Sequence, residues 1–205
     1  MNKLLIATRN QGKLKEISQF LSDLPIKTLS LSDMGIEDEF EEKGKTYKEN
    51  SRNKAIFYAK KSAIAAIADD GGIEITALGG GPGVKSRRWI GKNSTDEKII
   101  DHMKKLSLKI SDNKREAFFK TVISFALPNG QVWSSYGQVK GIIAKKPHLK
   151  LLKGYPYRSF FYLPKIRKYY HENDLTADEQ KLYNHRYKAI QKLKPIITRE
   201  LIIRI

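Results

Sequence analysis

The chain has 205 residues, of which 40% are hydrophobic and 30% charged, a composition typical of a folded globular domain with a buried core. It contains no cysteine, which excludes a disulfide framework, a thiolate metal site and a cysteine nucleophile. The formal net charge of +17 suits an anionic partner, which could be a nucleic acid, a membrane surface or a phosphate-rich small molecule, and it equally fits a solvated basic face.

Two features of the apolar residues bear on location. No apolar run approaches the length that is needed to span a bilayer. The run that follows the first three residues is too short for the core of a signal peptide, and no small-residue cleavage site follows it. We therefore expect a cytoplasmic protein without a membrane partner.

The N-terminal half of the chain alternates short apolar runs with helical patterns. Residues 3–7, 27–31 and 64–68 predict strands. Residues 13–24 predict a helix with one apolar face, and residues 46–62 predict a second helix.

The second half continues the alternation. Residues 95–106 predict a helix capped by Ser94 or Thr95, and residues 176–193 predict a last helix with a threonine cap. Residues 118–127 and 131–143 flank an Asn-Gly turn and predict a β-hairpin. The order of elements predicts an α/β fold, and we expect one domain that covers residues 1–205.

A polar turn between the first strand and the first helix could bind phosphate. Gly12 allows a tight turn, Thr8 and Asn10 offer polar side chains, and Lys13 adds a charge at the start of a helix. The spacing is not that of a Walker A loop. Taken alone, such a segment is more often an ordinary strand-to-helix turn than a phosphate site.

A second segment, Asp69-Asp70-Gly71-Gly72, follows the strand at 64–68, which we expect to end there. Ligands of α/β sheets bind at the carboxyl ends of strands, and Mg²⁺ is held by one or two carboxylates together with waters and substrate phosphates. The alternative is a simple turn that begins with Asp-Gly.

Two further segments complete the candidate site. The acidic loop with Glu41 and Glu42 could supply a second metal carboxylate, and Lys54 lies on the following helix. His185 and Arg186 are adjacent on the last predicted helix, where their side chains diverge by about 100°. The other histidines, His102, His148 and His171, show no metal-ligand spacing with each other or with His185.

In order and spacing, these segments resemble the inosine/xanthosine triphosphate pyrophosphatase family. The family pattern T-x-N-x-x-K is present as Thr8, Asn10 and Lys13, and the pattern E-E-T-G-x-T-F-x-E-N-A-x-x-K-A is matched from Glu41 to Ala55. The pattern A-D-D-S-G-L-x-V-x-A-L-G-G-x-P-G-V-x-S-A-R is matched from Ala68 to Arg88. The resemblance covers roughly residues 4–190.

The resemblance implies hydrolysis of a nucleoside triphosphate to the monophosphate and pyrophosphate. It implies an elongated α/β domain around a long curved mixed sheet, which forms a homodimer. Mg²⁺ would be held by Glu41 and Asp70, and Asp70 would also act as the general base toward water. The residues that the resemblance assigns to substrate binding are Thr8, Asn10, Lys13, Lys54, Gly71, Arg88, Tyr155, Tyr157, Arg158, His185 and Arg186.

The departures from the family pattern concentrate where the nucleobase is read. The family's D-D-S-G has Gly71 in place of serine, and its G-[FY]-G-Y-D-P aligns with residues 154–159, where Arg158 replaces the aspartate. The family's E-E-K-x-x-x-S-H-R aligns with residues 178–186, and Gln180 replaces the lysine. Aspartate accepts a hydrogen bond from the N1–H of a keto purine, whereas arginine only donates. We therefore expect a shifted base preference.

Two alternatives to an active pyrophosphatase stay open. Gly71 and the altered C-terminal segment also fit a catalytically weak relative that only binds nucleotides. The basic, tyrosine-rich segment from Lys140 onward could contact phosphates and stack on bases, as in a nucleic-acid-binding protein. No recognised nucleic-acid module is present, so nucleic acid is the least favoured partner.

Overall fold

The computed structural model describes residues 2–91, 94–152 and 154–203. These residues form two compact units. Unit 1 comprises Met1–Asp70, Thr121–Gly137 and Arg186–Ile205, and unit 2 comprises Gly71–Lys120 and Gln138–His185. The prediction of a single domain over residues 1–205 stays a prediction.

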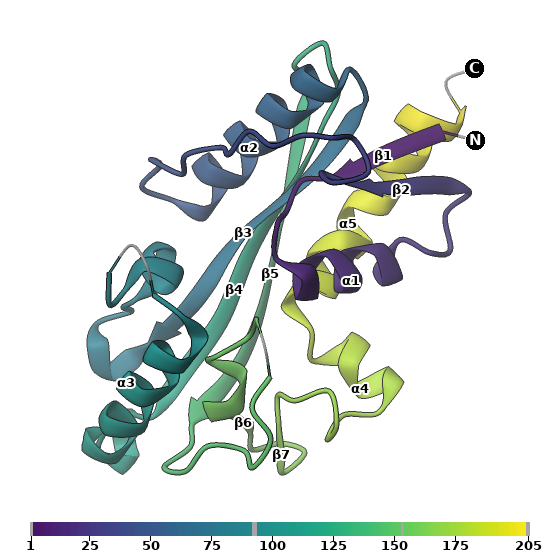
Figure 1. The fold of residues 1–205 in the computed structure, drawn as a ribbon. Helices are drawn as coiled ribbons and strands as arrows, with labels where there is room; N and C mark the ends of the chain where they lie inside the picture. The colour runs from purple at the N-terminus through teal and green to yellow at the C-terminus, as the bar shows by residue number, and fades with distance from the viewer. Residues whose placement is uncertain (1, 92–93, 153, 204–205) are drawn as a thin grey trace. The chain divides into compact units, whose positions relative to one another are not determined.

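The strands form one mixed sheet in the order β2-β1-β3-β4-β5-β6-β7 (Figure 1). β1 pairs in parallel with β2 and β3, whereas β6 pairs antiparallel with β5 and β7. The predicted α/β class and mixed sheet are therefore confirmed. The strand bounds are β1 Asn2–Ile6, β2 Ile26–Ser30, β3 Ala65–Ile75, β4 Glu116–Ala126, β5 Val132–Ile143, β6 Phe161–Leu163 and β7 Lys168–Tyr169.

Three helices begin at threonine caps, of which the sequence predicts Thr95 and Thr176. The side chains of Thr46, Thr95 and Thr176 each accept a hydrogen bond from a backbone N–H of the first helical turn. Within the described ranges, no helix is long and apolar enough to cross a membrane. The bounds are α1 Gln11–Phe20, α2 Tyr47–Ser62, α3 Asp96–Lys109, α4 Ala177–Leu182 and α5 His185–Thr198, and α5 runs into a π-helical turn at Arg199–Ile203.

The core of unit 1 lies on both faces of its part of the sheet, because successive strand residues point to opposite sides. Leu4 and Ile6 of β1 pack with residues of α1 and α5, whereas Leu5 and Ala7 pack with residues of α2. Figure 1 shows α2 on one side of β1 and β3, and α1 and α5 on the other. Strands that are covered on both faces are hydrophobic throughout, as the run at residues 4–7 is.

The core of unit 2 is aromatic. Phe119, Phe160, Phe161 and Tyr170 are nearly or fully buried and pack with isoleucines of β3 and α3. β5 and β6 approach closely at Gly141, where a Cβ atom would lie 2.5 Å from the ring of Phe161. Any larger residue at position 141 would therefore separate these strands.

Two predicted elements are corrected. The third strand does not end at residue 68. It continues to Ile75, because Gly71 and Gly72 stay extended and Ile73 and Ile75 are buried. The helix predicted over residues 176–193 is two helices, α4 and α5, which are interrupted at Tyr183 and Asn184. The interruption carries no Gly or Pro signal, although Asn is a residue that favours helix ends over helix interiors.

Candidate functional site

Asp69 and Asp70 lie inside β3 rather than after it, and both are buried. Neighbouring residues of a strand face opposite sides of the sheet. Asp69 contacts residues of α1 and α5, and Asp70 contacts a residue of α2. The two carboxylates therefore occupy different environments and do not act as one paired ligand set.

Asp69 is held by two cations and a hydroxyl. Lys13 Nζ lies 2.6 Å from Asp69 Oδ2, Arg186 Nε lies 3.3 Å from Asp69 Oδ1, and the Thr121 hydroxyl donates a hydrogen bond to the same carboxylate. Burial by itself would raise the pKa of Asp69, but Arg186 and Lys13 hold that pKa well below its usual range. Asp69 is therefore a permanently ionised anchor, and it was not among the predicted site residues.

Asp70 is on the face covered by α2 and has the opposite electrostatic balance. Asn50 Nδ2 donates a 3.0 Å hydrogen bond to Asp70 Oδ2. Burial and, next, the charge of Glu42 raise the pKa of Asp70 from 3.8 to about 6, although Lys13, Lys54 and Asn50 act in the other direction. A carboxyl that titrates near neutral pH is suited to proton transfer or to cation binding.

The turn at Thr8 and Asn10 forms the start of α1, as the sequence predicts. Asn10 is the helix cap, and its Oδ1 accepts a 3.0 Å hydrogen bond from the backbone N–H of Lys13. The Thr8 hydroxyl accepts a 3.2 Å hydrogen bond from the N–H of Asn10. Arg9, which the prediction left without a role, donates to the carbonyl oxygens of Glu37 and Asp38 and ties the acidic loop to this turn.

The acidic loop is also held by α2. The hydroxyl of Tyr58 donates to the carbonyl of Asp38 at 2.9 Å, and it accepts from the N–H of Phe40 at 3.2 Å. Asn50 Oδ1 accepts a 2.7 Å hydrogen bond from the N–H of Gly44. The loop that carries Glu41 and Glu42 is therefore fixed at both ends to residues of unit 1.

Within this loop, Glu42 rather than Glu41 lies beside Asp70. Glu42 Oε1 is 2.5 Å from Lys54 Nζ, and its charge contributes to the raised pKa of Asp70. The side chain of Glu41 is 74% exposed and lies 2.9 Å from Lys43, which is equally exposed. The predicted metal role of Glu41 is thus not supported by its placement, because alternation along the loop turns the second glutamate inward.

Lys54 reaches the same group from α2. Burial by itself would lower the pKa of Lys54, but Glu42, Asp70 and Asp69 together raise it. Arg186 also lies in unit 1, where Arg186 Nη1 is 3.1 Å from Glu16 Oε2, in addition to its contact with Asp69. Unit 1 therefore brings together six predicted residues, which are Thr8, Asn10, Lys13, Lys54, Asp70 and Arg186.

Apart from Glu41, which is in unit 1, the other predicted residues belong to unit 2. Gly71 continues β3, and the exposed Arg88 ends the short 3-10 segment Gly83–Arg88. The hydroxyl of Tyr157 donates a 2.6 Å hydrogen bond to the carbonyl of Ser86, and burial raises the pKa of Tyr157 above its usual range. Tyr157 is thus engaged in fixing the local backbone.

Arg158 and His185 are both buried in unit 2, and both contact Tyr170. Arg158 Cζ lies 3.9 Å from the ring centre of Tyr155 and 4.4 Å from that of Tyr170. The Tyr170 hydroxyl is 3.0 Å from His185 Nδ1. Arg158 and His185 are therefore linked through Tyr170, which no motif indicated, and Tyr155 joins this group through Arg158.

A histidine pair that sequence spacing did not reveal also lies in unit 2. Ligand atoms of His148, His171 and Asp174 are within 4.8 Å of one another. The two imidazole rings are stacked, with centroids 4.1 Å apart and planes 21° apart, so their in-plane lone pairs do not converge on one point. His171 Nδ1 accepts from the N–H of Asn173, which leaves the ring proton of a neutral imidazole on Nε2. This arrangement is therefore an aromatic stack rather than a ligand set.

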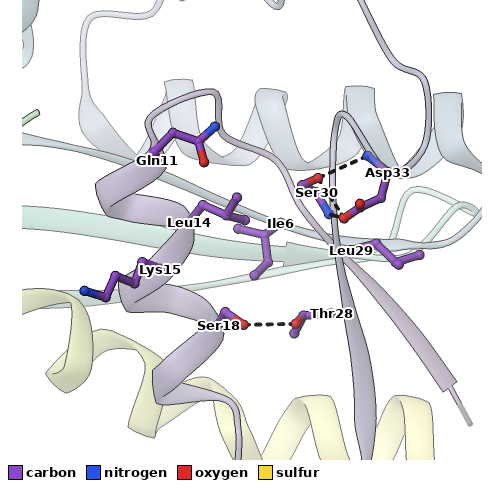
Figure 2. Close-up of a pocket in the computed structure, with 9 residues that line it drawn as sticks. All are labelled: Ile6, Gln11, Leu14, Lys15, Ser18, Thr28, Leu29, Ser30 and Asp33. Carbon is purple, nitrogen blue, oxygen red and sulfur yellow. Dashed lines mark hydrogen bonds between the residues drawn. The ribbon is translucent and has the colours of Figure 1, made fainter.

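Unit 1 also has an open pocket of about 310 Å³ between α1 and β2 (Figure 2). Ser18 and Thr28 close one end through a 3.1 Å hydrogen bond, and Ser30 and Asp33 form a turn at the other. None of the predicted site residues is among those that line it. The pocket is thus separate from the carboxylate and lysine groups on β3 and α2.

With this geometry in view, comparison with known proteins identifies related chains. The dITP/XTP pyrophosphatase of Clostridium perfringens (strain 13 / Type A) is 34% identical, covering 95% of this chain and 96% of its own. The dITP/XTP pyrophosphatase of Thermoanaerobacter pseudethanolicus is 36% identical to this chain, and the alignment covers 97% of this chain and 98% of the relative.

Solved structures agree with these relatives. A HAM1 protein from Coxiella burnetii superposes with a TM-score of 0.81 at 33% identity, covering 97% of this chain and 100% of its own. The Staphylococcus aureus Ham1 protein gives a TM-score of 0.78 at 32% identity, with the same coverage. The family model described as the Ham1 family matches residues 4–196. The resemblance indicated by the motifs is thereby confirmed, and the chain belongs to the Ham1 family.

Proposed function

We propose that this chain hydrolyses non-canonical purine nucleoside triphosphates to the monophosphate and pyrophosphate, and so removes them from the nucleotide pool. The observation that carries the proposal is the buried Asp70, whose pKa is raised to about 6 beside Glu42 and Lys54. Relatives of similar length that share the family are named dITP/XTP pyrophosphatases, which supports this substrate class.

The side chains around Asp70 fit a divalent cation. The negative charge of Glu42 makes ionisation of the buried Asp70 more costly, and a cation between the two carboxylates would relieve that repulsion. We propose Mg²⁺ as this cation, with Asp70 and Glu42 as the protein ligands. Bound Mg²⁺ would neutralise charge on the triphosphate oxygens.

The roles of the other residues follow from their contacts. Asn50 fixes one oxygen of Asp70, so that the carboxylate is oriented to accept a proton from the attacking water. Lys13 makes one ion pair with Asp69, and an ammonium group has three donors, so it can also bind a phosphate oxygen at the start of α1. From the family resemblance, we also assign triphosphate binding to Thr8, Asn10, Lys54, Gly71 and Arg88.

Arg186 acts in this proposal as a positioning residue. Its contacts with Asp69 and Glu16 anchor the start of α5 in unit 1. From the family resemblance, we assign base binding to Tyr155, Tyr157, Arg158 and His185, and Tyr157 also fixes the backbone at Ser86. We also propose, from the family resemblance, a cytoplasmic homodimer.

Pyrophosphate release from inosine, xanthosine, guanosine and adenosine triphosphates, with Mg²⁺ and with a chelator, tests the proposal. We expect Mg²⁺-dependent release that is fastest for a 6-oxo purine other than guanine. Binding without turnover would favour a nucleotide-binding relative. Tight binding to single-stranded or duplex nucleic acid that weakens steeply with salt would instead favour a nucleic-acid-binding protein.

A further inference from the structure

Arg9 lies within the polar turn that begins α1, between two residues that shape this turn. The Thr8 hydroxyl accepts from the N–H of Asn10, and Asn10 caps the helix. The side chain of Arg9 is exposed, yet its Nη2 donates to the carbonyl of Glu37 and, at 3.3 Å, to the carbonyl of Asp38. One guanidinium nitrogen therefore joins the α1 turn to the acidic loop, whose bonded carbonyls lie 28 and 29 residues further along the chain.

The carbonyl of Asp38 is the point at which two elements hold this loop. It accepts from Arg9 of the α1 turn and, at 2.9 Å, from the hydroxyl of Tyr58 on α2, so both of its lone pairs are used. Tyr58 is 3% exposed and also accepts from the N–H of Phe40. The side chain of Asp38 pairs with Lys61 at 2.6 Å, but a pair between such exposed groups adds little stability. The backbone of this stretch is thus fixed mainly by Arg9 and Tyr58.

The position of Glu42 follows from the two ends of a short segment. One end is fixed at the N–H of Phe40, and the other at Gly44, whose N–H donates a 2.7 Å hydrogen bond to Asn50 Oδ1. Three residues separate these two points, so a small movement of either end displaces Glu42 relative to Asp70. Mg²⁺ demands near-ideal octahedral geometry at short ligand distances, so its affinity depends on how its carboxylates are spaced.

We propose that Arg9 is a positioning residue that sets the place of Glu42, and with it the affinity for Mg²⁺, by clamping the acidic loop to the α1 turn. This inference rests on the proposed function, in which Glu42 and Asp70 hold the cation, and it gives a role to a residue that the family resemblance left without one. Arg9 acts here through hydrogen bonds to neutral carbonyls rather than through its charge. A lysine keeps the charge but ends one bond short of Nη2, so it does not replace the clamp.

Titration with Mg²⁺ in the absence of nucleotide tests the clamp. Arg9→Met and Arg9→Lys should each raise by about fivefold the Mg²⁺ concentration that produces a given rise in Tm, a coupling at the lower end of the usual range. Lys61→Met removes a cation that touches the side chain of Asp38 but leaves its carbonyl bonded, so it should match wild type. A normal Arg9→Lys beside a weakened Arg9→Met would show that charge is responsible and would overturn the proposal. A wild-type protein whose Tm does not respond to Mg²⁺ would overturn it as well.

Steady-state kinetics separates this positioning role from a direct phosphate contact. In Arg9→Met the Mg²⁺ concentration for half-maximal turnover should rise about fivefold, whereas kcat and KM for the triphosphate at saturating Mg²⁺ should stay close to the wild-type values. Lys13→Ala, by contrast, should raise KM at every Mg²⁺ concentration. A rise in the KM of Arg9→Met that saturating Mg²⁺ does not remove would place Arg9 among the phosphate ligands and refute the inference.

Amide hydrogen exchange gives a readout that needs neither metal nor turnover. In Arg9→Met the N–H of Phe40 should exchange at least about fivefold faster, because the stretch that Tyr58 holds has lost its second tie. The N–H of Leu14, which donates to the carbonyl of Asn10 within α1, should keep its protection and so report an intact helix. Unchanged exchange at Phe40 would contradict the clamp. If no triphosphate is hydrolysed while Phe40 exchanges faster and Mg²⁺ binds more weakly, the proposed function fails and the role of Arg9 stands.

Discussion

Asp69 and Asp70 are neighbours on β3 whose carboxylates face opposite sides of the sheet in unit 1, and the pKa values of the two are shifted in opposite directions. Asp69 is surrounded by Lys13 and Arg186 and stays ionised. Asp70 meets Glu42 and titrates near pH 6. One dipeptide thus supplies both a structural anchor and a reactive carboxyl, and the two are separable by substitution.

Asp70→Asn should abolish hydrolysis and, in metal-free protein at neutral pH, raise the free energy of unfolding. The sign follows from the raised pKa. The carboxyl of Asp70 is destabilising once it is ionised, so wild-type stability is lost as pH rises from about 4 toward 6 and above. The increase in the free energy of unfolding is at most about 3 kcal/mol, which is the free-energy equivalent of the pKa shift of Asp70. Urea denaturation at several pH values measures it, and equal stability of the two proteins at neutral pH would contradict the placement of Asp70.

Asp69→Asn should have the opposite effect on stability. Removing the carboxylate takes away the ion pair of the partly buried Lys13 and leaves the buried Arg186 with Glu16 alone, and breaking a buried pair typically costs about 3 kcal/mol. Because the folded pKa of Asp69 is depressed, its contribution is present above the unfolded value near 3.8 and is lost as pH falls below it. The difference in urea midpoint between the variant and wild type should therefore shrink in acid. A constant difference across pH would mean that packing, rather than charge, is responsible.

How much of this site the sequence predicts depends on distance along the chain. Motif order indicated Lys13, Lys54 and Asp70, and the local caps Thr95 and Thr176 were indicated by residue type alone. The separate roles of Asp69 and Asp70 do not follow from the sequence prediction, because the predicted strand stops at residue 68. The alternation of Ile73 and Ile75 is a signal that the strand continues. Side-chain partners distant in sequence left no such signal.

The clearest example is the contact of Arg158 with Tyr170. The substitution of arginine for the family aspartate was visible in the motif, but nothing local indicated that a tyrosine beyond two short strands would fix the guanidinium. The division of labour between His185 and Arg186 was hidden in the same way, because the break between α4 and α5 carries no Gly or Pro. The predicted divergence of the two side chains did not indicate their partners, which are Tyr170 for His185 and Asp69 for Arg186.

A matched pair of glutamates tests which residue holds Mg²⁺. Glu42→Gln should strongly reduce the rise in melting temperature that Mg²⁺ produces, because Glu42 lies beside Asp70. Glu41→Gln should leave that rise intact, since its side chain is largely exposed next to Lys43. Thermal denaturation with and without Mg²⁺ measures both. The reverse result would restore Glu41 as the metal ligand.

Lys13→Ala should weaken triphosphate binding by about 1.5–3 kcal/mol, the value of a charge-assisted hydrogen bond. Lys15 is the control, because it lies on the same helix, is exposed and lines the separate pocket between α1 and β2. Lys15→Ala should leave the affinity unchanged. Calorimetric titration with a non-hydrolysable triphosphate compares the two variants, and similar losses in both would indicate a general effect of charge rather than a specific phosphate contact.

Gly44→Ala should reduce turnover without touching any side chain that meets the substrate. A Cβ atom at position 44 would lie 2.5 Å from Asn50 Oδ1 and 2.9 Å from Glu49 Cγ, closer than real contacts allow. Asn50 is 1% exposed and joins the Gly44 N–H to Asp70, so it cannot move into solvent, and the added methyl group must shift Asn50 or the acidic loop. Either shift releases the oriented oxygen of Asp70, which should lower kcat by about tenfold to a hundredfold, because small misplacements of a reacting group are costly.

KM should change less, since Lys13 and the α1 turn are not displaced. Lys45→Ala, at the next exposed position, controls for general loosening of the loop. A variant Gly44→Ala with normal kcat would show that the hydrogen bond from Asn50 does not orient Asp70 during the reaction.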